Sequence, residues 1–221
     1  MNLPSIHHLH ISHMIVKNVN QNSPVEHLTV HQCYDTSLMY MPNLRTLTVN
    51  SLDCSGCLLN FSSPITHLSI ERSVGTWMFY FTELLVQLSS LVYLKIRDTS
   101  KLSADGSHWQ NALPNSVKKF ELITEFSDAF LNHSSILQSF QTPFWLVEKN
   151  WYINCEYHTL SKKTLLYTIP YYAPDYCFQL LSSIEFASTS LDHLENKMNN
   201  VKQLTIDTAA LASDTVNVST F

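Results

Sequence analysis

A short pattern of apolar and polar positions recurs along the chain. It is clearest in residues 25–33, VEHLTVHQC, and again in residues 44–52, LRTLTVNSL. Apolar residues occupy the first, fourth and sixth places, and polar residues lie between them. The end of the pattern alternates with a period of two, as in a β-strand that buries one face and exposes the other. We therefore expect every copy of this strand phrase to form a half-buried strand.

The strand phrase occurs seven times. Its apolar residues are Ile6/Leu9/Ile11, Val25/Leu28/Val30, Leu44/Leu47/Val49, Ile65/Leu68/Ile70, Leu91/Leu94/Ile96, Val117/Phe120/Leu122 and Val201/Leu204/Ile206. The first six copies begin 19 to 26 residues apart, near the roughly 20 to 29 residues of a leucine-rich repeat, in which each unit is a strand plus a return segment. The repetition predicts an α/β fold, a leucine-rich-repeat solenoid. In this horseshoe, parallel strands line the concave face, and helices and loops form the convex face.

We expect one leucine-rich-repeat domain over residues 1–221. Residues 1–126 hold the regular repeats, residues 127–186 a degenerate repeat with a hairpin, and residues 187–221 the last repeat. The interval from Val117 to Val201 is too long for one unit, and alternation at residues 151–157 predicts a degenerate strand within it. A turn through residues 161–163 and a strand at residues 165–172 complete a hairpin that would decorate the solenoid.

Helical spacing between the strand phrases predicts the convex layer. In residues 74–90, apolar residues recur at steps of three and four: Trp77, Phe81, Leu84, Leu85 and Leu88. Asp105 is expected to cap a second helix that ends before Pro114. Further helices are expected at residues 127–140, in a short segment before residue 151, and near residues 191–198.

The first strand phrase begins at Ile6, close to the start of the sequence. A terminal unit of a solenoid needs a polar cap, and an uncovered strand edge invites association. We therefore expect the chain to begin inside a larger architecture and its first strand edge to promote self-association. Residues 1–8 lack the basic and apolar stretches of a secretory signal.

Polar residues beside the central apolar places should form three columns on the concave face. The first is His8, His27, Thr46, His67, Tyr93, Lys119 and Gln203; the second is His10, Thr29, Thr48, Ser69, Lys95, Glu121 and Thr205; the third is Ser12, His31, Asn50, Glu71, Arg97, Ile123 and Asp207. The residues that we expect to bind a partner are His8, His27, His31, His67, Glu71, Tyr93, Lys95, Arg97 and Glu121. For any single position, a solvated sheet face with Thr and Ser favoured by strand propensity is the alternative interpretation.

Six histidines of the first two strand phrases lie close together in sequence: His7, His8, His10, His13, His27 and His31. Zinc sites usually combine ligands at fixed spacing with an oriented second shell. Of these histidines, only His8 and His10 are expected to share a face of one strand. We therefore expect exposed strand histidines and no metal site.

The cysteines do not form a recognisable metal or redox motif. Cys54 and Cys57 make a single C-x-x-C without a second pair or a thioredoxin-like βαβ pattern. Cys33 occupies the ninth place of its phrase, where leucine-rich repeats often carry Asn or a buried Cys. We expect five reduced thiols, as in a cytoplasmic or nuclear protein, and no cofactor.

Composition argues against several functions. The formal net charge is −5 with 13 Lys and Arg, and no basic stripe indicates nucleic-acid binding. No run of 18 or more apolar residues indicates a membrane span. With only three glycines, the chain has neither a phosphate-binding glycine loop nor a G-x-S-x-G elbow, so we expect no enzyme activity.

Most of the chain resembles a known family, and residues 140–171 are the most specific part of the match. Its marks are Asp105-Gly106 with Trp109, Leu113-Pro114 and Phe120, then FQTPFWLVEKNW at residues 140–151 with Cys155, then LYTIPY at residues 166–171. They are similar to the carboxy-terminal repeats of F-box/leucine-rich-repeat proteins of an invertebrate, lineage-expanded family. In that family an F-box binds the adaptor of a cullin-type ubiquitin ligase, and the repeats select the substrate. The F-box has no counterpart in this sequence.

The resemblance implies a protein-binding module that recognises a ubiquitin-ligase substrate through its concave columns, without chemistry of its own. An adaptor partner is implied only if an F-box precedes the repeats. The alternative is a stand-alone leucine-rich-repeat scaffold, or a fragment, with no ubiquitin-ligase link.

Overall fold

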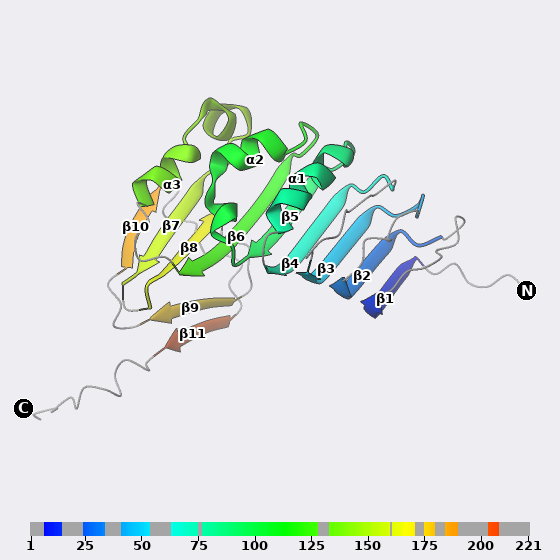
Figure 1. Cartoon of the computed structure of the whole chain (residues 1–221), viewed down its shortest axis with the longest axis horizontal. Coiled ribbons are helices and arrows are strands. Elements are labelled where there is room, and N and C mark those ends of the chain that lie inside the picture. The colour runs from blue at the N-terminus through cyan, green and yellow to red at the C-terminus, as the bar shows by residue number, and fades with distance from the viewer. Residues whose placement is uncertain are drawn as a thin grey trace, which may run out of the picture.

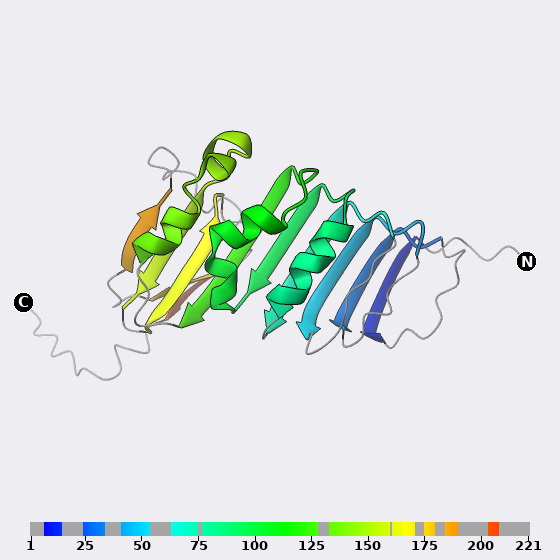
Figure 2. The ribbon, with the colours of Figure 1, turned by 45° about the horizontal axis from the view of Figure 1, so that its top comes forward.

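The computed structural model describes residues 7–14, 24–33, 41–53, 63–74, 77–127, 133–159, 161–170, 175–179, 184–189 and 203–207. Nine of the described strands form one open sheet, here called the large sheet, in the order β1-β2-β3-β4-β5-β6-β8-β7-β10. Strands β11 and β9 form a separate pair. Helices lie along one side of the large sheet (Figures 1 and 2). The fold is mixed α/β with a mostly parallel sheet, as the sequence predicts.

Strands β1 to β6 are the first six strand phrases, and all five junctions between them are parallel. Their bounds are β1 His8–Met14, β2 His27–Cys33, β3 Thr46–Asp53, β4 His67–Val74, β5 Tyr93–Asp98 and β6 Lys119–Ser127. Residues at the same place of the phrase are register partners, so that Leu28 pairs with Leu9 on one side and Leu47 on the other. The expected side-by-side order of these strands is confirmed.

Each of these junctions begins with the same pair of backbone hydrogen bonds. The carbonyl of His7 accepts from the N–H groups of Glu26 and His27, at 3.1 and 2.9 Å. Equivalent pairs recur at the carbonyls of Glu26, Arg45, Thr66 and Val92. The register is interrupted once along this series, between β4 and β5, where Ile70 pairs with Ile96 but Ser73 pairs with Asp98. β4 therefore carries one extra residue there, as in a β-bulge.

The apolar places of the phrases form the core beneath the helices. At the fourth place, the exposed fraction is 1% for Leu28 and Leu68 and 0% for Leu47 and Leu94. The sixth place is as well buried, with Val30, Ile70, Ile96 and Leu122 at 1% or less. Burial of one such side chain contributes about 1.5–3 kcal/mol, so the repeated apolar places dominate the stability of the parallel strands.

Along the chain, the described helices lie in the segments that connect the later strands, from the end of β4 onward. They are α1 Trp77–Gln87, the 3-10 helix η1 Lys101–Ala104, α2 Gly106–Ala112, α3 His133–Ser139 and the π-helix η2 Phe144–Glu148. Asp105 caps α2 as expected, since its Oδ1 accepts from the N–H groups of Ser107 and His108 at 2.9 and 3.3 Å. Of the helix expected at residues 127–140, the structure describes α3 from His133 to Ser139, and Ser127 belongs to β6. In the described part of the chain, no helix is long and apolar enough to cross a membrane.

Large aromatic residues join α2, η2 and β6. The ring centroids of Trp109 and Phe120 lie 5.1 Å apart, and Phe120 lies 5.9 Å from Trp145. The indole N–H groups of both tryptophans are satisfied, that of Trp109 by the Ser103 carbonyl at 2.9 Å and that of Trp145 by the Gly106 carbonyl at 3.2 Å. This cluster holds the helical layer on the sheet with no cost from an unpaired indole.

Lys149, which follows η2, links this part of the chain to the residues just before β6. Its Nζ donates to the carbonyls of Asn115 and Val117, at 3.2 and 3.0 Å. The same ammonium lies 5.3 Å from the centroid of Trp151. Burial lowers the pKa of Lys149, and the charge of Glu148 partly opposes this shift. The lysine therefore acts as a cross-link between backbone and aromatic ring.

The predicted hairpin is present, but its expected position outside the repeat array is wrong. It consists of β7 Ile153–His158 and β8 Lys163–Thr168. β8 pairs antiparallel with β6, β7 pairs antiparallel with β8, and β10 (Ile184–Ser188) pairs antiparallel with β7. The hairpin thus continues the large sheet. Its second strand, β8, pairs with the edge of β6, and β7 pairs with the other edge of β8.

The seventh strand phrase does not join the large sheet, contrary to expectation. It forms β11 Gln203–Asp207, which pairs in parallel with β9 Asp175–Gln179. Gln203, Thr205 and Asp207 therefore do not extend the columns of the large sheet. The pair lies on the side of that sheet away from the helices (Figures 1 and 2). The helix expected near residues 191–198 lies outside the described residues.

Candidate binding face

Polar side chains line the side of β1 to β5 that is turned away from the helices. The strand register aligns His8, His27, Thr46, His67, Tyr93 and Lys119 in one column and His10, Thr29, Thr48, Ser69, Lys95 and Glu121 in the next. On β1 to β5 these residues are exposed or half-buried, whereas the apolar residues that alternate with them on β2 to β5 are buried. We call this side of β1 to β5 the open face. Its residues are the members of these two columns on β1 to β5, together with His31, Asn50, Glu71 and Arg97. The first two predicted columns therefore exist across β1 to β6.

The end of the open face formed by β1 to β3 is rich in histidine. The imidazoles of His8 and His27 stack with centroids 4.4 Å apart and an interplanar angle of 5°. His31 is exposed, and its Nδ1 lies 3.2 Å from Nδ2 of Asn50 on the next strand. Within the described ranges, no three His, Cys, Asp or Glu side chains come together as a metal site would require. The predicted histidines thus contact their column neighbours.

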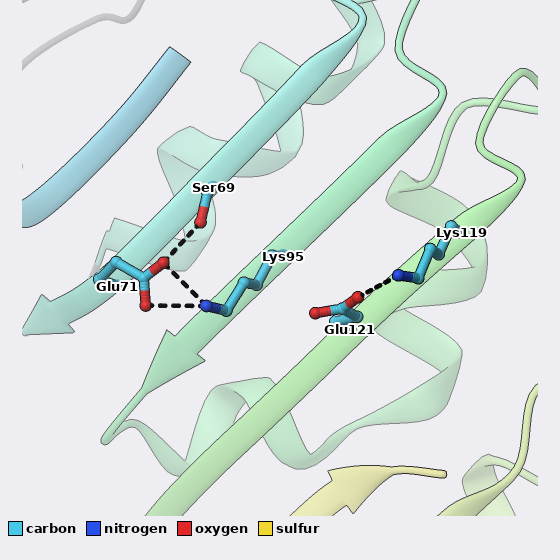
Figure 3. Close-up of polar contacts among 5 residues, drawn as sticks. All are labelled: Ser69, Glu71, Lys95, Lys119 and Glu121. Carbon is cyan, nitrogen blue, oxygen red and sulfur yellow. Dashed lines mark hydrogen bonds and ion pairs between the residues drawn. The ribbon is translucent and has the colours of Figure 1, made fainter. Parts of the chain in front are cut away.

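The end of the open face formed by β4 and β5 carries an ion pair between neighbouring strands. Lys95 Nζ donates to both carboxylate oxygens of Glu71, at 2.9 and 3.0 Å, and Ser69 Oγ donates to the same carboxylate at 2.8 Å (Figure 3). The side chains of Lys95 and Glu71 remain 19% and 36% exposed. Arg97, the other predicted cation, is half-buried two residues further along β5. The structure thus brings together the charged residues predicted on β4 and β5.

Next to this pair, Tyr93 lies between two polar neighbours. Its ring centroid is 5.7 Å from that of His67 and 5.1 Å from Nζ of Lys119. Lys119 also lies 2.7 Å from Oε1 of Glu121 on the same strand (Figure 3). Lys119 was not among the predicted binding residues, although its place in the column of Tyr93 could have indicated it. Its side chain is 52% exposed and therefore available to a partner.

Glu121, which the sequence predicts to contact a partner, is buried in the structure. The Glu121 side chain is only 4% exposed, although it lies in the same column as the half-buried Lys95. Its neighbour on the same face, Ile123, is also buried, at 4%. Both lie on β6, and the β9–β11 pair lies on this side of the large sheet (Figures 1 and 2). The series of exposed places that runs along β1 to β5 is therefore interrupted on β6 at Glu121 and Ile123.

Beyond β6, the same side of the sheet holds a buried polar network that the sequence did not reveal. Asn154 Nδ2 donates to Tyr167 Oη at 3.2 Å, and Tyr167 Oη donates to Glu156 Oε1 at 2.5 Å. His158 Nε2 lies 3.9 Å from the other oxygen of Glu156. These four side chains are at most 6% exposed. The network therefore fixes β7 against β8 and cannot reach a partner directly. Its only sequence signal was the polar residue at every second place of β7.

Cys155 lies in the core between these polar residues. Burial raises the pKa of its thiol to about 12, and the charge of Glu156 adds to the shift. Because only the thiolate is a good nucleophile and metal ligand, this cysteine is chemically inert in the folded protein. It supports packing and no reaction.

Comparison with models of known protein families, with curated proteins and with solved structures returned no match for this chain. The chemical character of the open face therefore rests on its own residues. Histidine, threonine, asparagine and one ion pair offer donors, acceptors and charges over several adjacent strands. Exposed ion pairs contribute only about 0–1 kcal/mol each, so a partner's charged groups can replace them at little cost. Such a surface is suited to reversible binding of a polar macromolecular surface.

Proposed function

We propose that the chain is a leucine-rich-repeat solenoid that acts as a non-catalytic protein-binding module, and that the open face is its binding site. The observation that carries this proposal is the open face itself. Five adjacent parallel strands present polar side chains in register and leave them accessible, while on the same face Glu121 and Ile123 of β6 and the polar side chains of β7 are buried. Accessible polar columns on a repeated scaffold are the usual binding surface of solenoids.

We further propose that the bound protein is a ubiquitin-ligase substrate, by resemblance to F-box/leucine-rich-repeat proteins. The residues that carry the resemblance are largely buried, among them Trp109, Phe120 and Trp145. They therefore support a shared architecture, whereas the choice of partner belongs to the open face. Its mixed charges, with Glu71 beside Lys95, favour a protein partner over a nucleic acid, which would require a basic stripe.

The binding site is tested by affinity capture from a lysate with three forms of the chain. In the first variant, Glu71, Lys95 and Arg97 of the open face are replaced by Ala. In the matched control, one acidic and two basic exposed residues outside the open face, Glu83, Lys101 and Lys118, are replaced by Ala. We expect proteins captured by the native chain and by the control to be absent with the first variant. Equal capture by all three forms would reject the open face as the site.

The ubiquitin-ligase link is tested separately by the coding sequence upstream of Met1. An F-box in frame with this chain supports the link. An in-frame stop codon overturns it and leaves a stand-alone scaffold. Because this test does not depend on the capture experiment, the link can fail while the binding site stands.

A further inference from the structure

The outer edge of β1 offers unused strand-pairing capacity. Among the described strands, β1 pairs only with β2 and lies at one end of the large sheet. The strands β2 to β6 each have a neighbour on both sides. A strand edge presents backbone N–H and C=O groups in a row, which readily pair with a further strand.

The core layer is also incomplete at β1. Leu9 occupies the fourth place of its phrase, yet it is only partly buried against the core, whereas Leu28 and Leu47 are 1% and 0% exposed. Leu28 has an apolar register partner on both sides, and Leu9 has one, Leu28 itself, among the described residues. An apolar residue placed outside Leu9 would therefore complete the layer.

The sequence of β1 has none of the charged or proline residues by which proteins protect an exposed edge. Its sequence, HLHISHM, contains no Lys, Arg, Asp, Glu or Pro. The strand at the opposite end of the large sheet, β10, contains Glu185. Charged residues and proline are the usual means of preventing edge-to-edge pairing. The two ends of the sheet therefore differ, and β1 is the end suited to association.

We infer that β1 pairs with β1 of a second copy of this chain, so that two large sheets join across a two-fold axis. In an antiparallel pair, residues directly opposite each other share one face of the sheet. A register centred on His10 places Ile11 of the second copy opposite Leu9 and sets the two His10 residues opposite each other. The β1 strand of the second copy thus supplies the outer apolar neighbour that Leu9 lacks among the described residues, and it places no Lys, Arg, Asp or Glu side chain in the interface. Such an interface is self-complementary and closes at two copies. It is independent of the binding role of the open face.

The test is sedimentation equilibrium of the full chain over a wide range of concentration, with two lysine variants. His10→Lys places two ammonium groups opposite each other at the centre of the interface, where like charges are destabilising. Thr29→Lys introduces the same charge in the same column, but on β2, one strand inside the edge. We expect the native chain and Thr29→Lys to form dimers, and His10→Lys to dissociate with a constant at least about tenfold higher, which corresponds to about 1.4 kcal/mol.

Amide hydrogen exchange gives a second readout that needs no variant. With rising concentration of the native chain, protection of β1 amides should increase while that of β3 amides stays constant. A native chain that is monomeric at every concentration would overturn the inference. So would dimers of His10→Lys as tight as those of the native chain, equal weakening by Thr29→Lys, or β1 protection that is independent of concentration.

Discussion

At the scale of single residues, the Cys155 thiol shows how burial decides chemistry. It is 1% exposed, and its raised pKa of about 12 keeps it protonated at neutral and mildly alkaline pH. An alkylating reagent such as iodoacetamide reacts with the thiolate, so at pH 8 we expect Cys155 to remain unmodified in the folded chain. In denaturant, where the thiol regains its usual acidity, we expect full modification. Peptide mass spectrometry resolves this site from the other cysteines. Equal rates in both states would contradict the buried environment.

Residue positions on the large sheet could be predicted from the phrase, but their exposure could not. Lys95 and Glu121 occupy the same place of successive phrases, and their Cα atoms are register partners. Lys95 is half-buried on the open face, while Glu121 is buried. The β9–β11 pair, distant in sequence, lies on the same side of the large sheet (Figures 1 and 2). A local pattern carries no information about where such a pair packs.

At the scale of elements, the contact between α2 and α3 depends on Gly106. A Cβ atom built on Gly106 would lie 2.4 Å from the Ser139 carbonyl oxygen and 2.8 Å from Cγ of Phe140. The Gly106 N–H also donates to Ser139 Oγ at 2.8 Å. The close approach therefore requires glycine, since a methyl group would push backbone against backbone.

We expect Gly106→Ala to lower the free energy of unfolding by about 1–3 kcal/mol, the usual cost of overpacking. The gain in helix propensity from alanine, at most about 1 kcal/mol, offsets only part of this. Ser107→Ala, at the next and exposed position of α2, is the matched control and should change stability by no more than about 0.5 kcal/mol. Urea denaturation measures both. A Gly106→Ala variant as stable as the control would show that α2 and α3 are not in close contact.

The elements that the sequence predicted well are those with a strong local signal. β1 to β6 follow from the spacing of the apolar triplets, and the start of α2 follows from Asp105. The position of β8 between β6 and β7 was missed, because β8 carries no strand phrase and its pairing joins segments about forty residues apart. The seventh phrase was predicted correctly as a strand, yet its partner is β9. A period of two predicts a strand and leaves its neighbour undetermined.

At the scale of the whole molecule, the large sheet combines two kinds of pairing. From β1 to β6 every junction is parallel and joins consecutive phrases, while from β6 to β10 every junction is antiparallel. If the first part is a repeat array, as proposed, each added neighbour should stabilise it. The second part is held by a hairpin and a buried polar network. The change at β6 coincides with the end of the open face, so the same junction limits both the parallel array and the proposed binding site.

If the parallel part behaves as a repeat array, its stability should vary along the sheet. β5 has strand neighbours on both sides and α1 and α2 nearby, whereas β1 has one described neighbour and a half-buried Leu9. The free energy of local opening should therefore be lowest at β1. In hydrogen exchange at low protein concentration, where the inferred dimer is dissociated, we expect amide protection to fall stepwise from β5 through β3 to β1. Uniform protection across β1 to β6 would mean that the strands open only as one cooperative unit. In that case stability is not a sum of neighbour contacts, and the proposal that this chain is a solenoid loses its energetic basis.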